Sequence, residues 1–548
     1  MPRSRLITLA GLLTVAAFVA GLLVGRATER TTDTDQPASE APAVTGVDGV
    51  TGVDGVETTE RFRPAVHFTP DENWMNDPNG PVYVDGEYHL FYQYNPFGNL
   101  WGNIGWGHAV SSDLVEWDEQ PMALASDPPD MAFSGSAVVD QANTSGLCGE
   151  DSGIDDDRDC LVAAYTGLVV DASTAITRQD QRIAVSDDGG QRFVPFAGNP
   201  VIDLDLADFR DPNVFWHEPS GRWILAVALP VERKVLFFAS DDLVDWEQIS
   251  EFGPAGAQDG LWECPVLVEL PIIGSDETRW MLKVDHNPGH VTGGSGAQYF
   301  VGDFDGTTFT ATEPAPDAEP RWVDFGADFY CAMTFSNEPD QASGRTWIGW
   351  MSNWDYASSV PTHPWRGAMT LPRTVVLTER DGALHLTQQL VEAFDDLRDD
   401  HRRYEGDSIA AIADDVADDA GGDVLDVVAS FELGDAAAVG LDLAGGERST
   451  VRIRYDVGAG ILTLDRTQSG EVTFAASFAA VHAAPVTPID GVLSMRIVLD
   501  RSSIELFADD GRVVLTDLIF PTPGATGVSV MSEGGESGPA TLDIWNLT

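Results

Sequence analysis

One local pattern recurs along this chain of 548 residues and constrains its fold more than any other feature. Each copy is an apolar strand, an acidic polar turn and an aromatic residue, as in "HAVSSDLVEW" and "FFASDDLVDW". The copies end at Trp117, Phe193, Trp246 and Phe309, with spacings of 76, 53 and 63 residues. One such unit per blade is typical of a β-propeller with loops of varying length. Polar turns of this kind occur in any all-β protein, but the shared aromatic end favours the propeller.

The fold class predicted from these patterns is all-β, with a five-bladed β-propeller followed by a C-terminal β-sandwich. Short β-type runs broken by Gly, Asp and Asn fill residues 61–386, and the strands at 345–385 supply the fifth blade. Residues 387–400, "TQQLVEAFDDLRDD", are the best candidate for a helix and form the predicted interdomain linker. From 401 to 548, apolar and polar residues alternate as in antiparallel strands with one wet face, which indicates the sandwich.

The N-terminal segment, residues 1–25, predicts export. Arg3 and Arg5 precede an uncharged run from Leu6 to Gly25, which is long enough to span a bilayer. The positive flank predicts that the chain start stays inside and the rest lies outside. We expect a signal anchor, with a cleaved signal peptide as the alternative, so the protein is extracellular or on the cell surface. Residues 26–60 lack large apolar groups, repeat the hexapeptide TGVDGV, and are predicted to be a disordered acidic linker.

The charge balance is extremely acidic, with 88 Asp and Glu against 31 Lys and Arg and a net charge of -57. This balance excludes nucleic-acid binding, because no basic face is available to neutralise phosphates. The acid is spread along the folded part and only two lysines are present, Lys234 and Lys283. Such a surface predicts adaptation to high salt in a halophile, because the Debye length falls to roughly 3 Å at molar salt. An acidic patch that binds metals or basic partners is the alternative.

The four cysteines fall into two pairs with different settings. Cys148 and Cys160 flank an acidic loop and either form a disulfide in an oxidising compartment or stay apart. The loop between them is a candidate calcium ligand, and a solvated acidic insertion is the alternative. Cys264 and Cys331 lie in apolar surroundings and are expected to be buried free thiols.

Three acidic residues stand in unusual contexts. Asp77 lies in "WMNDPNG", which predicts a tight turn whose backbone amides keep the carboxylate ionised. Asp211 follows Arg210 in "FRDPNV", and Glu263 lies in the apolar run "LWECPVL", which predicts a raised pKa suited to a general acid. Taken singly, these are a turn residue, an arginine-paired acid and a buried structural Glu. Taken together, two carboxylates in contrasting environments indicate a glycosidase.

Several segments then carry a resemblance to a known family. "HFTPDENWMNDPNGPVYVDGEYHLFYQYNP", "WGNIGWGHAVSSDLVEW", "FSGSAV", "FRDPNVF", "WECPVL" and "GWMSNWDYASSVPTHPWRGAMTLPR" resemble the successive motifs of glycoside hydrolase family 32. That family includes levanases, inulinases and invertases, and the match runs from about residue 65 to 375 in unbroken order. The resemblance implies a site in the central funnel of the propeller, a retaining double displacement, and no metal or cofactor. The implied substrates are the terminal β-D-fructofuranosyl residues of fructans (levan, inulin) and of sucrose.

The resemblance also assigns roles to residues. It makes Asp77 the nucleophile, Glu263 the acid/base and Asp211 the stabiliser of the transition state. The retaining mechanism predicts that the carboxyl groups of Asp77 and Glu263 lie about 5 to 5.5 Å apart. Candidates for binding the sugar are Asn76, Gln93, Trp101, Ser134, Arg210, Asp328 and Trp354. The chain departs from the family at Cys331, after "DFY", where a small residue such as Ala is common.

Two other functions remain open at this stage. A fructosyltransferase would use the same three acids and replace water by a sugar hydroxyl. A non-catalytic fructan-binding surface protein is disfavoured, because Asp77, Asp211 and Glu263 are all present. The preference among levan, inulin and sucrose, exo against endo action, and the oligomeric state are not predicted.

Overall fold

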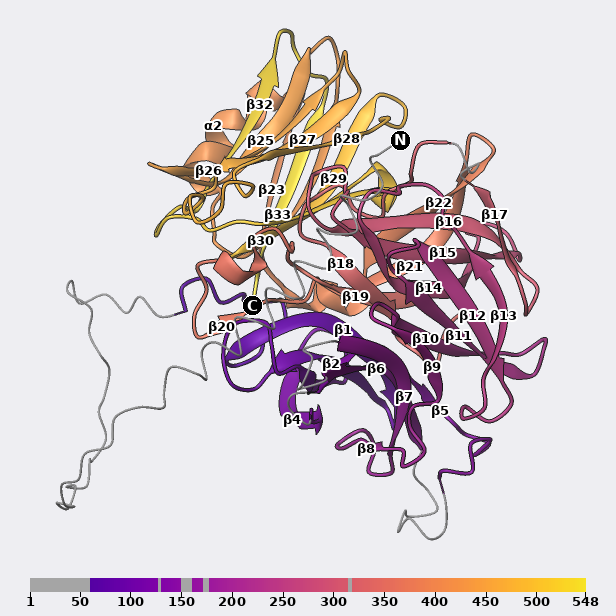
Figure 1. Cartoon of the computed structure of the whole chain (residues 1–548). Coiled ribbons are helices and arrows are strands. Elements are labelled where there is room, and N and C mark those ends of the chain that lie inside the picture. Colours follow the sequence, from indigo (N-terminus) through magenta and orange to yellow (C-terminus); the bar gives the residue numbers. More distant parts are fainter. Residues whose placement is uncertain (1–59, 127–129, 149–159, 171–176, 314–317) are drawn as a thin grey trace, which may run out of the picture.

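The computed structural model describes residues 60–126, 130–148, 160–170, 177–313 and 318–548 (Figure 1). The predicted anchor and all but the last residue of the predicted linker lie outside these residues. None of the helices within the described part is both long and apolar enough to cross a membrane. The described chain is almost entirely β-structure and forms a propeller followed by a sandwich, which confirms the predicted fold class.

The propeller consists of five antiparallel sheets, each built from consecutive strands. The first sheet contains β1 (Asn73–Val84), β2 (Glu87–Asn95), β3 (Gly105–Ser111) and β4 (Asp118–Leu124), with β20 (Trp365–Arg366) added in parallel to β1. The second contains β5 (Met131–Val139), β6 (Leu161–Val170), β7 (Thr177–Ser186), β8 (Val194–Pro195) and β9 (Ile202–Leu206). The third contains β10 (Arg210–His217), β11 (Arg222–Leu229), β12 (Lys234–Ser240) and β13 (Glu247–Phe252).

The remaining two sheets complete the ring. The fourth contains β14 (Leu261–Pro271), β15 (Thr278–Asn287), β16 (Gly296–Phe304) and β17 (Phe309–Glu313). The fifth contains β18 (Tyr330–Thr334), β19 (Arg345–Trp350), β21 (Arg373–Arg380) and β22 (Ala383–Leu390). The first strands contact one another in the cyclic order β1, β5, β10, β14, β18 and back to β1, so they surround a common axis. This closed order is what defines the sheets as propeller blades.

Apolar side chains from adjoining blades fill the space between them. Separate buried clusters join blades one and two, two and three, three and four, and four and five. A fifth cluster joins blades five and one and continues into the sandwich through Val498, Phe507 and Leu547. Because every blade has both faces covered, the strands are apolar on both sides and show little of the strict alternation seen in a half-exposed sheet.

The sandwich packs two antiparallel sheets around a core of its own. One sheet has the order β23 (Arg398–Gly406), β33 (Ala540–Leu547), β24 (Leu425–Glu432), β29 (Val492–Asp500), β30 (Ser503–Ala508) and β31 (Val513–Leu518). The other has the order β28 (Val481–Pro485), β27 (Ile461–Gln468), β26 (Ser449–Asp456), β25 (Ala438–Gly446) and β32 (Gly527–Glu533). Its strands alternate buried and exposed residues, as the sequence pattern predicts.

The helix predicted at residues 387–400 is wrong. Strand β22 runs to Leu390, and the 3-10 helix η2 (Glu392–Leu397) is followed directly by β23. Pairing of β22 with β21 overrides the helical pattern of this segment, because the ladder and the burial of Leu390 decide its conformation. The α-helix of the sandwich is α2 (Ile409–Asp419), in which Ser408 caps the N-terminus by accepting a hydrogen bond from Ala411 N–H.

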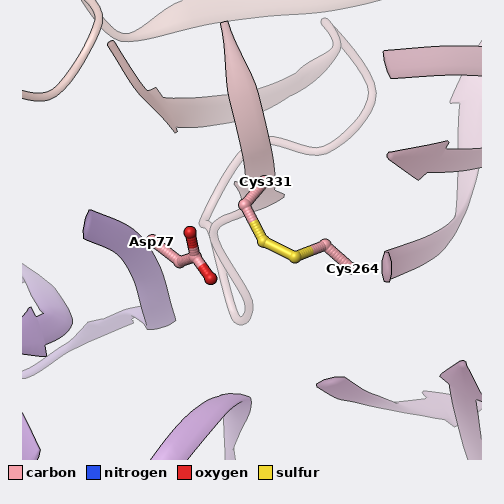
Figure 2. Close-up of side chains that lie close together, drawn as sticks. All are labelled: Asp77, Cys264 and Cys331. Carbon is pink, nitrogen blue, oxygen red and sulfur yellow. A yellow bond between two sulfur atoms is a disulfide. The ribbon is translucent and has the colours of Figure 1, made fainter. Parts of the chain in front are cut away.

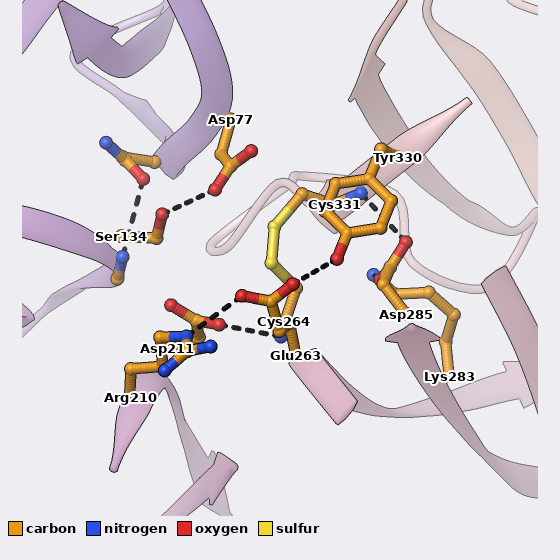
Figure 3. The surroundings of a disulfide bond; sticks show 12 residues. Asp77, Ser134, Arg210, Asp211, Glu263, Cys264, Lys283, Asp285, Tyr330 and Cys331 are labelled. Carbon is orange, nitrogen blue, oxygen red and sulfur yellow. Dashed lines mark hydrogen bonds and ion pairs between the residues drawn. A yellow bond between two sulfur atoms is a disulfide. The ribbon is translucent and has the colours of Figure 1, made fainter. Parts of the chain in front are cut away.

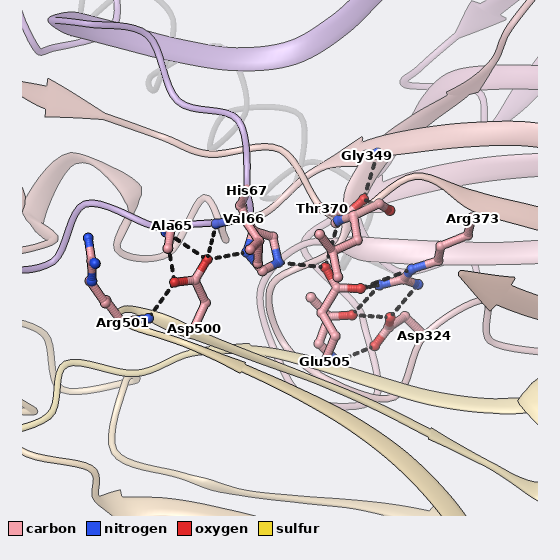
Figure 4. Close-up of polar contacts among 12 residues, drawn as sticks. Ala65, Val66, His67, Asp324, Gly349, Thr370, Arg373, Asp500, Arg501 and Glu505 are labelled. Carbon is pink, nitrogen blue, oxygen red and sulfur yellow. Dashed lines mark hydrogen bonds and ion pairs between the residues drawn. The ribbon is translucent and has the colours of Figure 1, made fainter. Parts of the chain in front are cut away.

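Buried ion pairs join the sandwich to the propeller (Figure 4). The Arg373 guanidinium in blade five donates to Glu505 Oε2 at 2.7 Å and to Asp324 Oδ2 at 3.2 Å. Glu505 on β30 also contacts His67 Nε2 at 3.1 Å, and His67 Nδ1 lies 2.8 Å from Asp500 Oδ2. The segment that leads into β1 is therefore held against the sandwich by charged groups that are fully enclosed.

Burial alone would lower the pKa of His67, but the hydrogen bonds and charges of Asp500 and Glu505 raise it to about 9. An unfolded histidine titrates near 6.5, so the extra stability is complete below about pH 6.5 and is lost as the pH rises toward 9. The difference between the two pKa values corresponds to about 3 kcal/mol.

We therefore predict that His67→Gln lowers the free energy of unfolding by about 3 kcal/mol at pH 6 and by clearly less at pH 10. Denaturant titrations of the parent and the variant at both pH values measure this. His401→Gln is the control, because His401 is half-exposed and contacts Asp543 at the surface, where such pairs contribute about 0–1 kcal/mol. An equal loss at both pH values would contradict a charged His67.

Candidate active site

The first strand of each blade is interrupted at the same place. The strand register shifts in β1, β5, β10, β14 and β18, and the residues skipped are 76–77, 133–134, 211–212, 264–265 and 331–332. Such bulges redirect side chains and are frequent beside active sites. The five bulges therefore bring residues that are far apart in sequence to the propeller axis.

The predicted turn at "DPNG" is wrong, because the whole segment lies within β1. Pro78 follows the bulge, where the ladder does not require the N–H that proline lacks. Gly80 has φ +46, and a Cβ there would lie 2.8 Å from Ala137 Cβ in the next blade. Of the residues expected to form a turn, Pro78 thus follows a bulge and Gly80 allows two blades to approach closely.

The structure brings the three predicted acids together (Figure 3). Ser134 Oγ donates to Asp77 Oδ2 at 2.7 Å, and Arg210 Nε donates to Glu263 Oε1 at 2.9 Å. Asp211 Oδ2 accepts the Cys264 N–H at 2.9 Å. Each donor comes from a blade next to that of its acceptor, so the cluster is held together across blade boundaries.

Asp77 is deeply buried, and one oxygen of its carboxylate has no hydrogen-bond partner among the described residues. Burial raises its pKa to about 7, the Ser134 hydrogen bond opposes the shift, and the charge of Glu263 adds to it. The expectation that turn amides keep Asp77 ionised is wrong, since Oδ2 accepts from a side-chain hydroxyl and Oδ1 has no partner within the described part. That oxygen is buried as well as unpaired, which adds to the cost of ionising Asp77.

Other acids share this enclosed space. Burial raises the pKa of Asp211, and the charges of Glu263 and Asp77 act in the same direction while Arg210 opposes them. Burial also raises the pKa of Asp285 to about 6, although the Lys283 ammonium at its carboxylate lowers it. Neighbouring carboxylates disfavour one another's ionised forms, so such a cluster retains a proton near neutral pH.

Most of the predicted sugar-binding residues lie near the bulges. Asn76 is 2% exposed, and its Oδ1 accepts from Trp74 Nε1 at 2.7 Å. Gln93 Nε2 donates to Ala132 O, next to the second bulge, at 3.3 Å. The rings of Trp101 and Phe133 pack edge to face with their centroids 5.9 Å apart. The rings of Trp354 and Trp74 stack with their centroids 6.0 Å apart.

Asp328 does not line this site. It is fully buried, and its carboxylate accepts hydrogen bonds from Tyr356 Oη at 2.7 Å and from Arg466 Nη1 of the sandwich at 2.6 Å. It belongs to the contact between the two folded parts. Tyr330, two residues later in "DFY", reaches the acids instead and donates from its hydroxyl to Glu263 Oε2. Within this motif, Tyr330 rather than Asp328 contacts the acids.

The free thiols expected at Cys264 and Cys331 are also wrong, because the two residues form a disulfide beside Asp77 (Figure 2). They are 67 residues apart, and closing a loop of that length stabilises a fold by about 4 kcal/mol through the unfolded chain. No sequence spacing signals such a pairing; the bulges bring the two residues together. Cys148 and Cys160 form a disulfide too, while the acidic loop considered for calcium lies outside the described residues.

No thiolate remains to hold a metal here. The Asp77 carboxylate and the sulfur atoms of Cys264 and Cys331 lie within 4.8 Å of one another, but the two sulfurs are bonded together. A small cavity lies among the bulges and is lined by Ser134, Gly135, Asp211, Pro212, Cys264, Pro265, Cys331 and Met333. The site thus consists of carboxylates, hydroxyls and the Arg210 guanidinium gathered around a small cavity.

We predict that Ser134→Ala raises the pH at which activity falls on acidification by about one unit. The Ser134 hydroxyl lowers the pKa of Asp77 by stabilising its ionised form, so its loss makes protonation easier. The pH profile of kcat/KM measures this shift. Ser136→Ala is the control, since Ser136 Oγ contacts backbone atoms of Pro212 and Val214 and none of the acids. Equal profiles for Ser134→Ala and the parent would contradict the assignment.

Sequence comparisons match the chain to one family over almost all of its folded length. Residues 67–389 match the Glycosyl hydrolases family 32 N-terminal domain, and residues 394–546 match the family 32 C-terminal domain. The chain is 42% identical to a levanase of Bacillus subtilis over 493 residues, covering 89% of this chain and 70% of the levanase. It is 39% identical to an extracellular exo-inulinase of Aspergillus awamori, covering 89% of this chain and 94% of that protein.

Solved structures show the same architecture. The crystal structure of the Aspergillus awamori exo-inulinase superposes with a TM-score of 0.81 at 38% identity, covering 89% of this chain and 98% of that one. A β-fructofuranosidase of Schwanniomyces occidentalis complexed with fructosyl-erythritol superposes with a TM-score of 0.80 at 33% identity, covering 90% and 99%. On this evidence the chain belongs to glycoside hydrolase family 32.

Proposed function

We propose that this glycoside hydrolase releases terminal β-D-fructofuranosyl residues from fructans and sucrose with retention of configuration. The observation that carries the proposal is the pair of differently held carboxylates. Asp77 has one carboxylate oxygen without a hydrogen-bond partner among the described residues, whereas Glu263 is bound on both oxygens by Arg210 and Tyr330. One group suits attack on a sugar carbon, and the other suits proton transfer at the leaving oxygen. Relatives that are levanases and exo-inulinases support this substrate class.

In the proposed mechanism, the ionised Asp77 attacks the anomeric carbon of fructose while Glu263 protonates the departing oxygen. A covalent fructosyl–Asp77 ester forms, and the bond to the aglycone breaks. Glu263 then removes a proton from water, which attacks the same carbon and restores both residues. Arg210 donates to one oxygen of Glu263 and so fixes the position of the carboxyl that acts in both steps.

Asp211 is the proposed stabiliser of the transition state. Its Oδ2 is bound to the Cys264 N–H, and its own N–H donates to Thr166 Oγ1 at 3.0 Å. These contacts fix the carboxylate at the third bulge, where it accepts hydrogen bonds from fructose hydroxyls as positive charge develops on the ring. Asn76, Gln93 and Trp101 are the proposed walls of the fructosyl pocket, with Trp354 stacked behind Trp74.

We predict that Glu263→Gln lowers kcat on sucrose by roughly a thousandfold, because the leaving oxygen loses its proton donor. The loss should be much smaller on an aryl β-fructofuranoside whose nitrophenolate leaves without a proton. Asp77→Asn should abolish turnover on both substrates. Glu338→Gln is the control, since Glu338 is a buried glutamate of blade five that accepts a hydrogen bond from Thr346 N–H and contacts none of the three acids. Parent-like rates for Glu263→Gln on sucrose would refute the proposal.

Product analysis at high sucrose separates hydrolysis from fructosyl transfer. We expect free glucose and fructose in nearly equal amounts, because water completes the second step. Accumulation of longer oligosaccharides, with glucose in large excess over fructose, would instead identify a fructosyltransferase. Binding of fructan without any turnover would identify the non-catalytic alternative.

The setting of the enzyme is proposed from its surface and from its relatives. Several relatives are extracellular exo-inulinases, which supports export of this chain. A net charge of -57 supports function at high salt, where repulsion between acidic groups is screened. Initial rates on sucrose, inulin and levan at low and molar sodium chloride test this, and higher rates and stability at molar salt are expected. Loss of activity at molar salt would contradict it.

A further inference from the structure

The Cys264–Cys331 disulfide joins equivalent positions of two neighbouring blades. Each cysteine is a bulge residue on the first strand of its blade, β14 or β18. Both have left-handed backbones, with φ 45 for Cys264 and φ 52 for Cys331, and Asp211 in the third blade has φ 67. This conformation is unfavourable for residues with a side chain and persists only where the surroundings hold it.

Each cysteine also directly follows a residue of the active site. Glu263 precedes Cys264, and Tyr330 precedes Cys331. The Cys264 N–H binds Asp211, and the Cys331 N–H binds Asp285 Oδ1 at 2.8 Å. A shift of either bulge would therefore move Glu263, its hydroxyl donor or an acid that lies beside them.

Hydrogen bonds join three other blade boundaries at this level. Ser134 binds Asp77 between blades two and one, Ser136 binds Pro212 O between blades two and three, and Cys264 binds Asp211 between blades four and three. Between blades four and five, the hydrogen bond from Tyr330 to Glu263 acts on the proposed catalyst itself. The disulfide is the covalent contact that holds this boundary closed.

We propose that the Cys264–Cys331 disulfide is a positioning element for the acid/base residue, and this rests on the proposed role of Glu263. By fixing the two bulges to one another, the bridge keeps the Tyr330 hydroxyl on Glu263 Oε2 and the Glu263 carboxyl facing Asp77. A bridge that only stabilises the fold would leave the kinetics unchanged.

The test compares two double variants of the full chain. Cys264→Ala/Cys331→Ala removes the active-site bridge, and Cys148→Ala/Cys160→Ala removes the other disulfide, whose cysteines flank residues 149–159. We expect the first variant to lose about tenfold or more in kcat on sucrose with KM changed less than about threefold. On the nitrophenyl fructofuranoside the loss should be at most about threefold. The control variant should match the parent on both substrates.

A second measurement links the bridge to Glu263. If the Tyr330 hydroxyl and the bridge both act through the Glu263 carboxyl, their effects are not independent. The loss of kcat when Tyr330→Phe is combined with removal of the bridge should then be smaller than the product of the two single losses. Cys331→Ala alone opens the same bridge with a smaller change of volume and serves if the double variant does not fold. Thermal unfolding of each variant separates lost stability from lost turnover.

Parent-like kcat on sucrose for a folded variant that lacks the bridge would overturn the inference. An equal loss on sucrose and on the nitrophenyl substrate would also overturn it, since that pattern reports general damage to the site. Failure of the proposed function appears differently, as full activity of Glu263→Gln. An inactive Glu263→Gln together with a fully active bridge variant rejects the positioning role alone.

Discussion

The site depends on a backbone irregularity repeated at the propeller axis. A regular β-ladder would send successive side chains to opposite faces of each blade, into the apolar layers between blades. The bulges of β1, β5, β10, β14 and β18 interrupt that alternation at one level, so polar residues can point along the axis. Without them, Asp77 and Asp211 would face apolar packing, at a large desolvation penalty.

The electrostatic cost of gathering carboxylates is distributed over several donors. Ser134, Arg210 and Tyr330 each contribute one contact to the acids, and Lys283 lies against Asp285. Ser134, Arg210 and Tyr330 reach across blade boundaries, so the same three contacts that make the cluster tolerable also fix the blades relative to one another. The same hydrogen bonds and ion pairs therefore serve both the acid cluster and the packing of the blades, so the buried acids are part of the fold.

The sequence predicted the architecture and the gathering of Asp77, Asp211 and Glu263, because repeat spacing and local motifs carry that information, while their roles in catalysis stay predictions. It predicted the wrong local structure at "DPNG" and at 387–400, because pairing with neighbouring strands outweighed local propensity in both segments. It also missed Tyr330 and the Cys264–Cys331 bridge, and assigned Asp328 to the pocket. These features arise from contacts between residues far apart in sequence, which a single chain without its fold does not reveal.

The Asp328 contact has a consequence for how the two folded parts depend on one another. Arg466 of β27 binds Asp328, and Tyr330 stands two residues further along the same segment, with its hydroxyl on Glu263. The sandwich is thus linked to the acid cluster through the short segment from Asp328 to Tyr330. A propeller separated from its sandwich would leave the Asp328 carboxylate without the Arg466 guanidinium, two residues before Tyr330. The two folded parts therefore depend on one another, because a sandwich residue helps to fix the segment that brings Tyr330 to Glu263.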